Sequence, residues 1–172
     1  MANGAERAKK SIALVGLPGA GKTSVGRRLA ARLHLPFEDS DAAIETETRL
    51  TVPELFAQAG EAAFRALERR AIARLAEGPL KVLATGGGAF VDPGSRALLL
   101  ARCIVIWLDG DVGAFAARAG PRPLLDPADP VSSLRRLAGA RNPIYAEAHL
   151  RIDCGTLKPN QVADLILAKL RT

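Results

Sequence analysis

The chain has 172 residues, of which 48% are hydrophobic and 24% are charged, a balance that suits one compact domain with its own core. Twenty-four Lys and Arg against eighteen Asp and Glu leave a net charge of +6, which favours anionic ligands because the guanidinium fork of Arg matches phosphate and carboxylate oxygens. Aromatic residues make up only 4% and no long basic run occurs, which argues against nucleic acid as a partner.

The N-terminal residues, the apolar runs and the cysteines also exclude some classes of protein. Residues 1–10 are polar and basic, which predicts a flexible N-terminus and does not resemble a secretory signal. The longest apolar runs, residues 97–101 and 103–108, fall well short of the roughly 20 residues of a membrane span. Cys103 and Cys154 lack metal-ligand spacing and are expected to be buried thiols. We therefore expect a cytoplasmic protein with no membrane partner, and a monomer is the simplest expectation.

The first predicted strand, residues 11–15, leads into a glycine-rich loop and then a helix-forming segment rich in Ala, Leu and Arg. Residues 16–23 match the phosphate-loop pattern GxxxxGK[ST], in which backbone N–H groups surround a polyphosphate at a helix N-terminus. Lys22 is suited to reach the outer phosphates, and the Thr23 hydroxyl to ligate Mg²⁺. The predicted ATP-binding residues here are Gly16, Gly19, Ala20, Gly21, Lys22, Thr23 and Ser24.

Two carboxylates follow the second predicted strand, residues 36–39. Asp39 is suited to water-mediated Mg²⁺ coordination, and Asp41 to accept a hydroxyl proton. Helix capping by Ser40 or Asp41 is the structural alternative. Next along the chain, Thr51 with Glu54 predicts a capping box.

Glycines mark the next boundaries. Gly60 is expected to close the short helix that Thr51 begins, and Gly78 with Pro79 to stop a helix over residues 61–77. The third predicted strand, residues 81–84, is followed by Thr85 and three glycines, 86–88. Adjacent glycines let a small molecule approach bare backbone and use its N–H groups, with a plain turn as the alternative.

The remaining elements continue the alternation of strands and helices. Asp92 and Asp111 are expected to begin helices, the fourth and fifth strands are predicted over residues 103–108 and 150–153, and Pro159 begins a last helix that runs to residue 170. Asp109 follows the fourth strand, where many phosphate-loop enzymes have a Mg²⁺ aspartate. We do not expect it to bind metal, because Asp109-Gly110 is typical of an ordinary turn and Asp39 already offers a carboxylate. Residues 118–130 contain four prolines and two arginines, Arg118 and Arg122, and are predicted to form a lid over the phosphates.

Strands that alternate with helices predict an α/β fold with a five-stranded parallel sheet sandwiched by helices. Ligands of such sheets bind at the carboxyl ends of the strands, where this chain places its carboxylates and glycines. His34, His149 and Trp107 lie away from these positions, so we expect packing or surface roles for them.

Six segments occur in an order that resembles the shikimate kinase family and span about residues 12–170. They are the phosphate loop, 37–41 (FEDSD), 64–68 (FRALE), 86–88 (GGG), 122–125 (RPLL) and 141–145 (RNPIY). The resemblance implies a P-loop, nucleoside-monophosphate-kinase-like fold with a mobile lid, in one domain over residues 1–172 whose substrate-binding region covers about 40–68. It also implies transfer of the ATP γ-phosphoryl group to the 3-hydroxyl of shikimate in aromatic amino-acid biosynthesis.

Site roles follow from the resemblance. Lys22, Asp41 and Arg122 are the implied catalytic residues, with Asp41 on the ring hydroxyls and Arg122 in the lid. Arg118 is placed near the adenine. The implied substrate contacts are Asp41, Phe56, Phe64, Arg65, Gly86, Gly87, Gly88 and Arg141, with the two arginines on the carboxylate; Thr23 and Asp39 are the metal ligands. Glu68 is positioned to orient Arg65, although such pairs also occur on solvated helix faces.

Three alternatives remain at this point. A gluconate kinase or a nucleoside monophosphate kinase shares the loop and the fold class. A catalytically silent kinase-like regulatory module is expected to lack Lys22, Asp41 or the lid arginine, and all three are present. The chain departs from the family pattern at Leu157, where a polar or basic residue is expected, and in a shorter spacing between Arg118 and Arg122.

Overall fold

A computed structural model describes residues 10–172 of the chain. It contains one parallel five-stranded sheet in the order β2-β3-β1-β4-β5. The strands are β1 (Ser11–Val15), β2 (Phe37–Asp39), β3 (Val82–Ala84), β4 (Cys103–Asp109) and β5 (Leu150–Asp153). The three central strands are almost wholly buried, as expected where helices cover both faces of a parallel sheet. The predicted fold class is confirmed.

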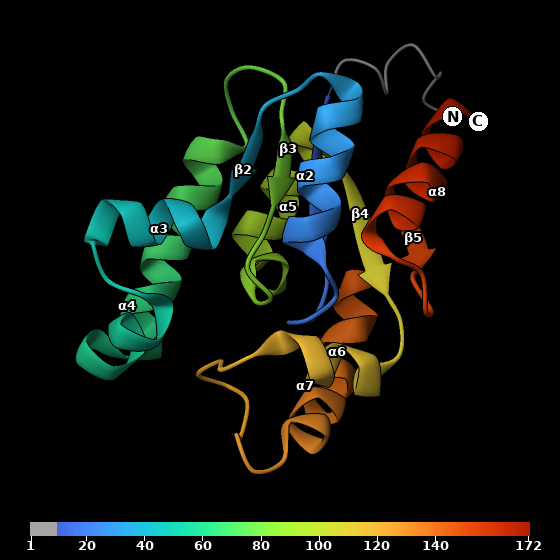
Figure 1. Cartoon of the computed structure of the whole chain (residues 1–172). Coiled ribbons are helices and arrows are strands. Elements are labelled where there is room, and N and C mark those ends of the chain that lie inside the picture. Colours follow the sequence, from blue (N-terminus) through green and yellow to red (C-terminus); the bar gives the residue numbers. More distant parts are fainter. Residues whose placement is uncertain (1–9) are drawn as a thin grey trace.

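Helices surround this sheet in two layers (Figure 1). The helical elements are α2 (Lys22–Leu33), α3 (Ser40–Thr48), α4 (Val52–Leu75), the short 3-10 helix η1 (Ala89–Val91), α5 (Pro93–Arg102), α6 (Val112–Ala119), α7 (Pro130–Tyr145) and α8 (Pro159–Arg171). In Figure 1, α2 and α8 lie side by side in front of the sheet and α5 lies behind it, while α6 and α7 lie beyond the carboxyl ends of β4 and β5. The carboxyl edge of the sheet is therefore enclosed by α3, α4, α6 and α7.

Several predicted helix boundaries are confirmed. The Thr51 and Glu54 side chains form a reciprocal capping box at the start of α4, and Asp92 and Asp111 cap α5 and α6. Gly60 has φ 84° and ψ 171°, so it interrupts α4 as expected. These boundaries depend on local hydrogen bonds and on one left-handed position, which the sequence itself specifies.

Two helices, α3 and α7, lie where no helix was predicted. Asp39, rather than Ser40 or Asp41, caps α3, since its carboxylate accepts hydrogen bonds from the backbone N–H groups of Asp41 and Ala42. The segment predicted as an irregular lid over 118–130 is shorter than expected. Arg118 belongs to α6 and Pro130 begins α7, because Pro suits the first helical turn and Asp129 caps it.

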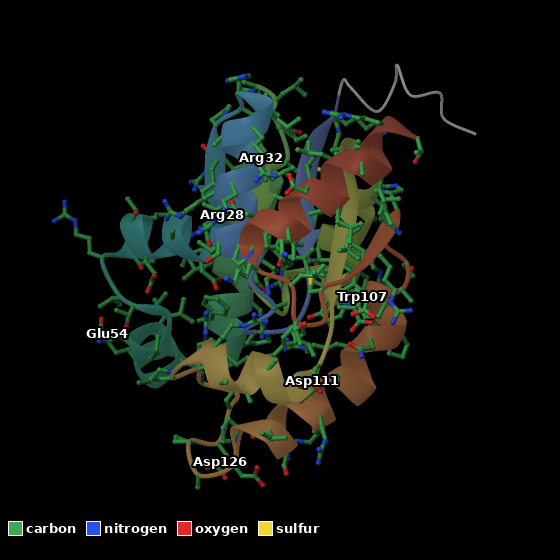
Figure 2. All side chains as sticks on the ribbon, turned by 45° about the vertical axis from the view of Figure 1, so that its right-hand side comes forward. Arg28, Arg32, Glu54, Trp107, Asp111 and Asp126 are labelled. Carbon is green, nitrogen blue, oxygen red and sulfur yellow. The ribbon has the colours of Figure 1, made fainter. Side chains whose placement is uncertain are left out.

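The core is built around β1, β3 and β4, and a second, smaller cluster of Ile44, Leu55, Phe64 and Ala71 joins α3 to α4. Trp107 on β4, labelled in Figure 2, is 6% exposed, as predicted. Cys103 and Cys154 are buried free thiols. Between residues 10 and 172, none of the helices is long and apolar enough to cross a membrane. The second cluster holds the start of α4 beside the carboxyl edge of the sheet.

Candidate active site

The loop between β1 and α2 depends on glycine at two packed positions. Gly19 has φ +82°, and a Cβ there would lie 2.1 Å from the carbonyl oxygen of Phe115. Gly16 has φ +147°, and its Cβ would lie 2.7 Å from the carbonyl oxygen of Leu108. Only glycine satisfies both the backbone conformation and the contact. The loop is therefore held against the end of β4 and against α6.

Lys22 is the first residue of α2, and its side chain reaches back to this loop. Its Nζ donates hydrogen bonds to the carbonyl oxygens of Gly16 at 2.6 Å and Leu17 at 2.9 Å. Burial lowers the pKa of Lys22 from 10.5 to about 8, although the nearby Asp41 carboxylate acts in the opposite direction. The ammonium thus keeps its charge near neutral pH in a poorly solvated place, where attraction to a phosphate is strong.

The two predicted metal ligands are in direct contact. The Thr23 hydroxyl donates to Oδ2 of Asp39 at 2.7 Å, while Oδ1 of Asp39 caps α3. Within residues 10–172 there is no group of three or more His, Cys, Asp or Glu side chains that could hold a metal ion. One hydroxyl and one carboxylate oxygen fit Mg²⁺, which keeps waters and takes most of its other ligands from substrate phosphates in kinases.

Two hollows open side by side at the carboxyl edge of the sheet. The phosphate hollow is lined by Pro18, Gly19, Gly21, Lys22, Thr23, Ser24, Arg27, Asp39, Asp41, Ala42, Glu45, Thr85, Gly86, Gly87, Arg118 and Arg122. The acid hollow is lined by Pro18, Asp41, Val52, Phe56, Phe64, Arg65, Glu68, Gly87, Gly88, Arg122, Pro123, Leu124, Leu125 and Arg141. The shared residues, Pro18, Asp41, Gly87 and Arg122, mark where the hollows meet.

Most of the predicted site residues therefore come together, with three differences of position. Gly16 and Ala20 are buried residues of the phosphate loop and line neither hollow. Gly86 lines the phosphate hollow rather than the acid hollow. Its backbone N–H donates to the Ser40 hydroxyl at 2.9 Å, so this N–H group is already used within the protein.

Asp41 lies in the first turn of α3 at the junction of the hollows. Its Oδ2 is 3.8 Å from a guanidinium nitrogen of Arg122, and its buried Oδ1 has no hydrogen-bond partner within the described residues. Burial, together with the Asp39 and Glu68 carboxylates, raises the pKa of Asp41 from 3.8 to about 6, against the opposing charges of Arg122 and Lys22. This carboxylate is thus more basic than an ordinary one and still ionised at neutral pH.

The Arg65 side chain is held by two carboxylates of its own helix, α4. Its guanidinium donates to Glu68 at 2.8 Å and forms a longer contact with Glu61. The Glu68 side chain is 2% exposed, so the pair is not a solvated surface pair. Burial raises the pKa of Glu68, while the Arg65 charge and hydrogen bond act to lower it. Glu68 orients Arg65 as expected.

The three glycines after β3 make room for side chains of the protein itself. A Cβ at Gly86 would lie 2.6 Å from Oδ1 of Asp41 and 2.9 Å from Oε2 of Glu68. A Cβ at Gly87 would lie 3.2 Å from Nη1 of Arg141, and one at Gly88 only 2.3 Å from Nη1 of Arg65. Each glycine thus accommodates a different charged group, which a plain turn would not require.

The connecting segment, residues 120–129, joins α6 to α7 and contributes side chains that the sequence-based site lacks. Pro123, Leu124 and Leu125 line the acid hollow, and Leu125 is 5% exposed. Asp126, labelled near the lower edge of the molecule in Figure 2, lies on the side of this segment that faces away from the sheet. The motif at 122–125 was a signal for these residues. Val52 is a further lining residue, and the capping box just before it gave no indication of that contact.

Apolar rings and a further arginine complete the two hollows. Phe56 and Phe64 have ring centroids 4.9 Å apart and line the acid hollow. On the phosphate side, Nε of Arg118 donates to the carbonyl oxygen of Gly19 at 3.2 Å, and its guanidinium lies over the Phe115 ring. Arg118 is therefore attached to the phosphate loop from α6.

Asp109 takes part in the turn that follows β4 and in an ion pair with β5. Its Oδ2 pairs with Arg151 at 2.6 Å, and its Oδ1 accepts a hydrogen bond from the N–H of Gly110. It lines neither hollow.

Comparisons with known proteins agree with this geometry. A family model for shikimate kinase matches residues 18–171. The chain is 48% identical over 165 residues to the shikimate kinase of Caulobacter vibrioides, covering 94% of this chain and 82% of that one. The structure of the shikimate kinase from Acinetobacter baumannii in complex with shikimate is 39% identical with TM-score 0.91, covering 96% of this chain and 95% of that one. A gluconokinase from Sinorhizobium meliloti, 20% identical with TM-score 0.61 over 95% and 93% of the two chains, shares the fold alone. The chain belongs to the shikimate kinase family.

Proposed function

We propose that this protein transfers the γ-phosphoryl group of ATP to the 3-hydroxyl of shikimate, giving shikimate 3-phosphate and ADP, in aromatic amino-acid biosynthesis. One observation carries the proposal: Asp41 lies where a hollow containing Lys22 meets a hollow containing Arg65 and Arg141. The cations of the phosphate hollow suit a polyphosphate, and those of the acid hollow suit a carboxylate. The Asp41 carboxylate at the junction suits a substrate hydroxyl that lies between the two hollows.

In the phosphate hollow, the loop from Gly16 to Ser24 and the lid would hold ATP. Lys22 would bind the outer phosphates, and Arg122, at the junction, would stabilise charge on the group in transfer. Arg118 would lie beside the adenine. Thr23 and Asp39 would hold Mg²⁺, which when bound neutralises phosphate charge. Positioning and charge neutralisation are the main demands of phosphoryl transfer.

In the acid hollow, Arg65 and Arg141 would grip the shikimate carboxylate, and Phe56 and Phe64 would pack against the ring. The backbone of Gly87 and Gly88 would approach the ligand closely; Gly86, whose N–H is bonded to Ser40, supports them from the phosphate side. Asp41 would bind the reacting hydroxyl and accept its proton as the oxygen bonds to phosphorus, so the proton ends on Asp41.

A coupled ADP-release assay with Mg·ATP tests the function. Shikimate is expected to support turnover, whereas gluconate and nucleoside monophosphates are expected to support little, since the buried Arg141 and the half-buried Arg65 favour a compact carboxylate. Activity with gluconate or a nucleotide in place of shikimate would favour the corresponding kinase. No ADP with any acceptor would favour a silent regulatory module. The proposal includes a cytoplasmic protein whose partners are ATP and shikimate.

The pH dependence of the turnover rate with shikimate and Mg·ATP both well below their KM values, which reports the free enzyme, is expected to be bell-shaped. Protonation of Asp41, whose pKa is raised to about 6, removes the proton acceptor, so activity falls as pH drops through that value. Deprotonation of Lys22, whose pKa is lowered to about 8, removes a phosphate contact, so activity falls above that value. Circular dichroism at pH 5 and 9 serves as the folding control. Constant activity from pH 5 to 9 would contradict both assignments.

A further inference from the structure

Tyr145 is a buried polar residue that the proposed chemistry does not use. It ends α7, four residues after Arg141, so the two side chains lie on one face of the helix. The Tyr145 side chain is fully buried, and its ring packs beside Trp107 with centroids 6.0 Å apart. A phenol in such a place needs hydrogen-bond partners, because an unpaired buried hydroxyl is costly.

The groups around this hydroxyl belong to the acid hollow. It donates to the carbonyl oxygen of Gly87 at 2.5 Å, and the Arg141 guanidinium lies against the same glycine, since a Cβ at Gly87 would stand 3.2 Å from Nη1 of Arg141. A phenol has an acceptor as well as a donor, and a guanidinium only donates, so the oxygen that donates its hydrogen to Gly87 is free to accept one from Arg141. Burial raises the pKa of Tyr145, with the Arg141 charge opposing it, and the phenol therefore stays protonated as the donor to Gly87.

The two arginines of the acid hollow are held in different ways. Arg65 is paired with Glu68 and Glu61, which offset its charge. Arg141 is only 8% exposed, and within residues 10–172 it forms no ion pair within 4.0 Å. A neutral phenol orients a guanidinium without neutralising it. The buried positive charge of Arg141 consequently remains available for an anionic ligand.

We propose that Tyr145 is a positioning residue for carboxylate recognition, whose hydroxyl fixes the Arg141 guanidinium and the Gly87 backbone relative to one another. The inference rests on the proposed function and deepens it. Tyr145 itself does not line the acid hollow and acts through Arg141. Its helical spacing from Arg141 sets the distance between the two groups, and the packing against Trp107 holds the ring in place.

Steady-state kinetics of Tyr145→Phe test this role. The variant keeps the ring and loses the hydroxyl, so KM for shikimate is expected to rise about tenfold or more, as for a lost hydrogen bond to a charged group, while KM for ATP stays within about twofold. Ser11→Ala is the matched control, because it removes a buried hydroxyl that accepts from the Lys81 N–H at the opposite end of the sheet. It is expected to change neither KM.

A double-mutant cycle separates positioning from general destabilisation. If Tyr145 acts through Arg141, most of the Tyr145→Phe penalty should vanish in an Arg141→Lys background. An equal penalty in both backgrounds, a parallel rise in both KM values, or an unchanged KM for shikimate would overturn the proposal. Wild-type protein without shikimate-dependent ADP release would instead overturn the proposed function, and this inference with it.

A second measurement does not depend on the folding of the Phe variant. Tyr145 is the only tyrosine of the chain, so labelling with 3-fluorotyrosine gives a single ¹⁹F resonance. Shikimate is expected to shift this resonance because its carboxylate pairs with the guanidinium beside the ring, and ADP alone is expected to shift it little. The shikimate-induced shift should disappear in the Arg141→Lys protein. A shift that persists there, or none in the wild type, would contradict the role.

Discussion

Replacement of Asp41 by Asn is expected to lower kcat by about 10²- to 10⁴-fold, the range for loss of a general base, while affinity for ATP changes little. Asn keeps the size of the side chain and loses the proton-accepting charge. Calorimetric titration with a non-hydrolysable ATP analogue measures binding, and the ADP-release assay measures turnover. Since the fold disfavours the ionised form of Asp41, the neutral amide is not expected to lower the melting temperature near neutral pH.

Lys22→Ala provides the contrast to this variant. It removes the ammonium that the carbonyl oxygens of Gly16 and Leu17 hold in the phosphate loop, so both ATP affinity and turnover are expected to fall. Small and equal effects of the two substitutions would mean that Asp41 and Lys22 have been assigned the wrong roles. A large loss of ATP affinity in Asp41→Asn would likewise contradict the separation of functions.

Gly88→Ala is expected to lower kcat/KM for shikimate on the order of 10²-fold without unfolding the protein, by loss of a charge-assisted contact. The new Cβ would lie 2.3 to 2.8 Å from three atoms of the Arg65 guanidinium. Gly88 has φ −96° and ψ −5°, a conformation that alanine is also able to adopt. The flexible end of Arg65 must therefore move away from the acid hollow, while the backbone stays in place.

Gly139→Ala is the matched control for this substitution. Gly139 lies within α7, and nothing stands within 4 Å of its Cβ position, so alanine there is expected to stabilise the fold by about 0.5 to 1 kcal/mol with unchanged kinetics. Thermal unfolding of both variants and KM for each substrate complete the comparison. Normal kcat/KM for shikimate in Gly88→Ala would show that Arg65 does not depend on this glycine.

Local signals in the sequence predicted much of the fold. The strands were recognisable as short apolar runs, and Thr51, Asp92 and Asp111 marked helix starts because each cap bonds within a few residues of itself. By contrast, α3 and α7 were not predicted. The cap of α3 is the same Asp39 that contacts Thr23, and α7 begins at a proline inside a proline-rich stretch, where composition favours a loop.

The candidate site was predictable to the extent that its residues belong to motifs. Asp41, Arg65 and Arg141 could be assigned because each stands in a recognisable segment, and the structure brings all three to one hollow. Leu125 also stands in such a segment, whereas Val52 does not, and the sequence does not distinguish an apolar residue that lines a hollow from one that fills the core. Nor does the sequence reveal that Gly86, Gly87 and Gly88 face different charged side chains, because those contacts join segments far apart in the chain.

The amino-acid order alone determined the parallel α/β class, the phosphate loop and the family, since each depends on periodicity or on neighbours within one segment. Tertiary structure decided how the charges are used. It paired Arg65 with Glu68, left Arg141 beside a neutral phenol, and shifted the pKa of Asp41 and Lys22 toward neutral pH. The physical reason is that desolvation and Coulomb energy depend on the distances between side chains in the folded protein, and these are set by packing rather than by position in the chain.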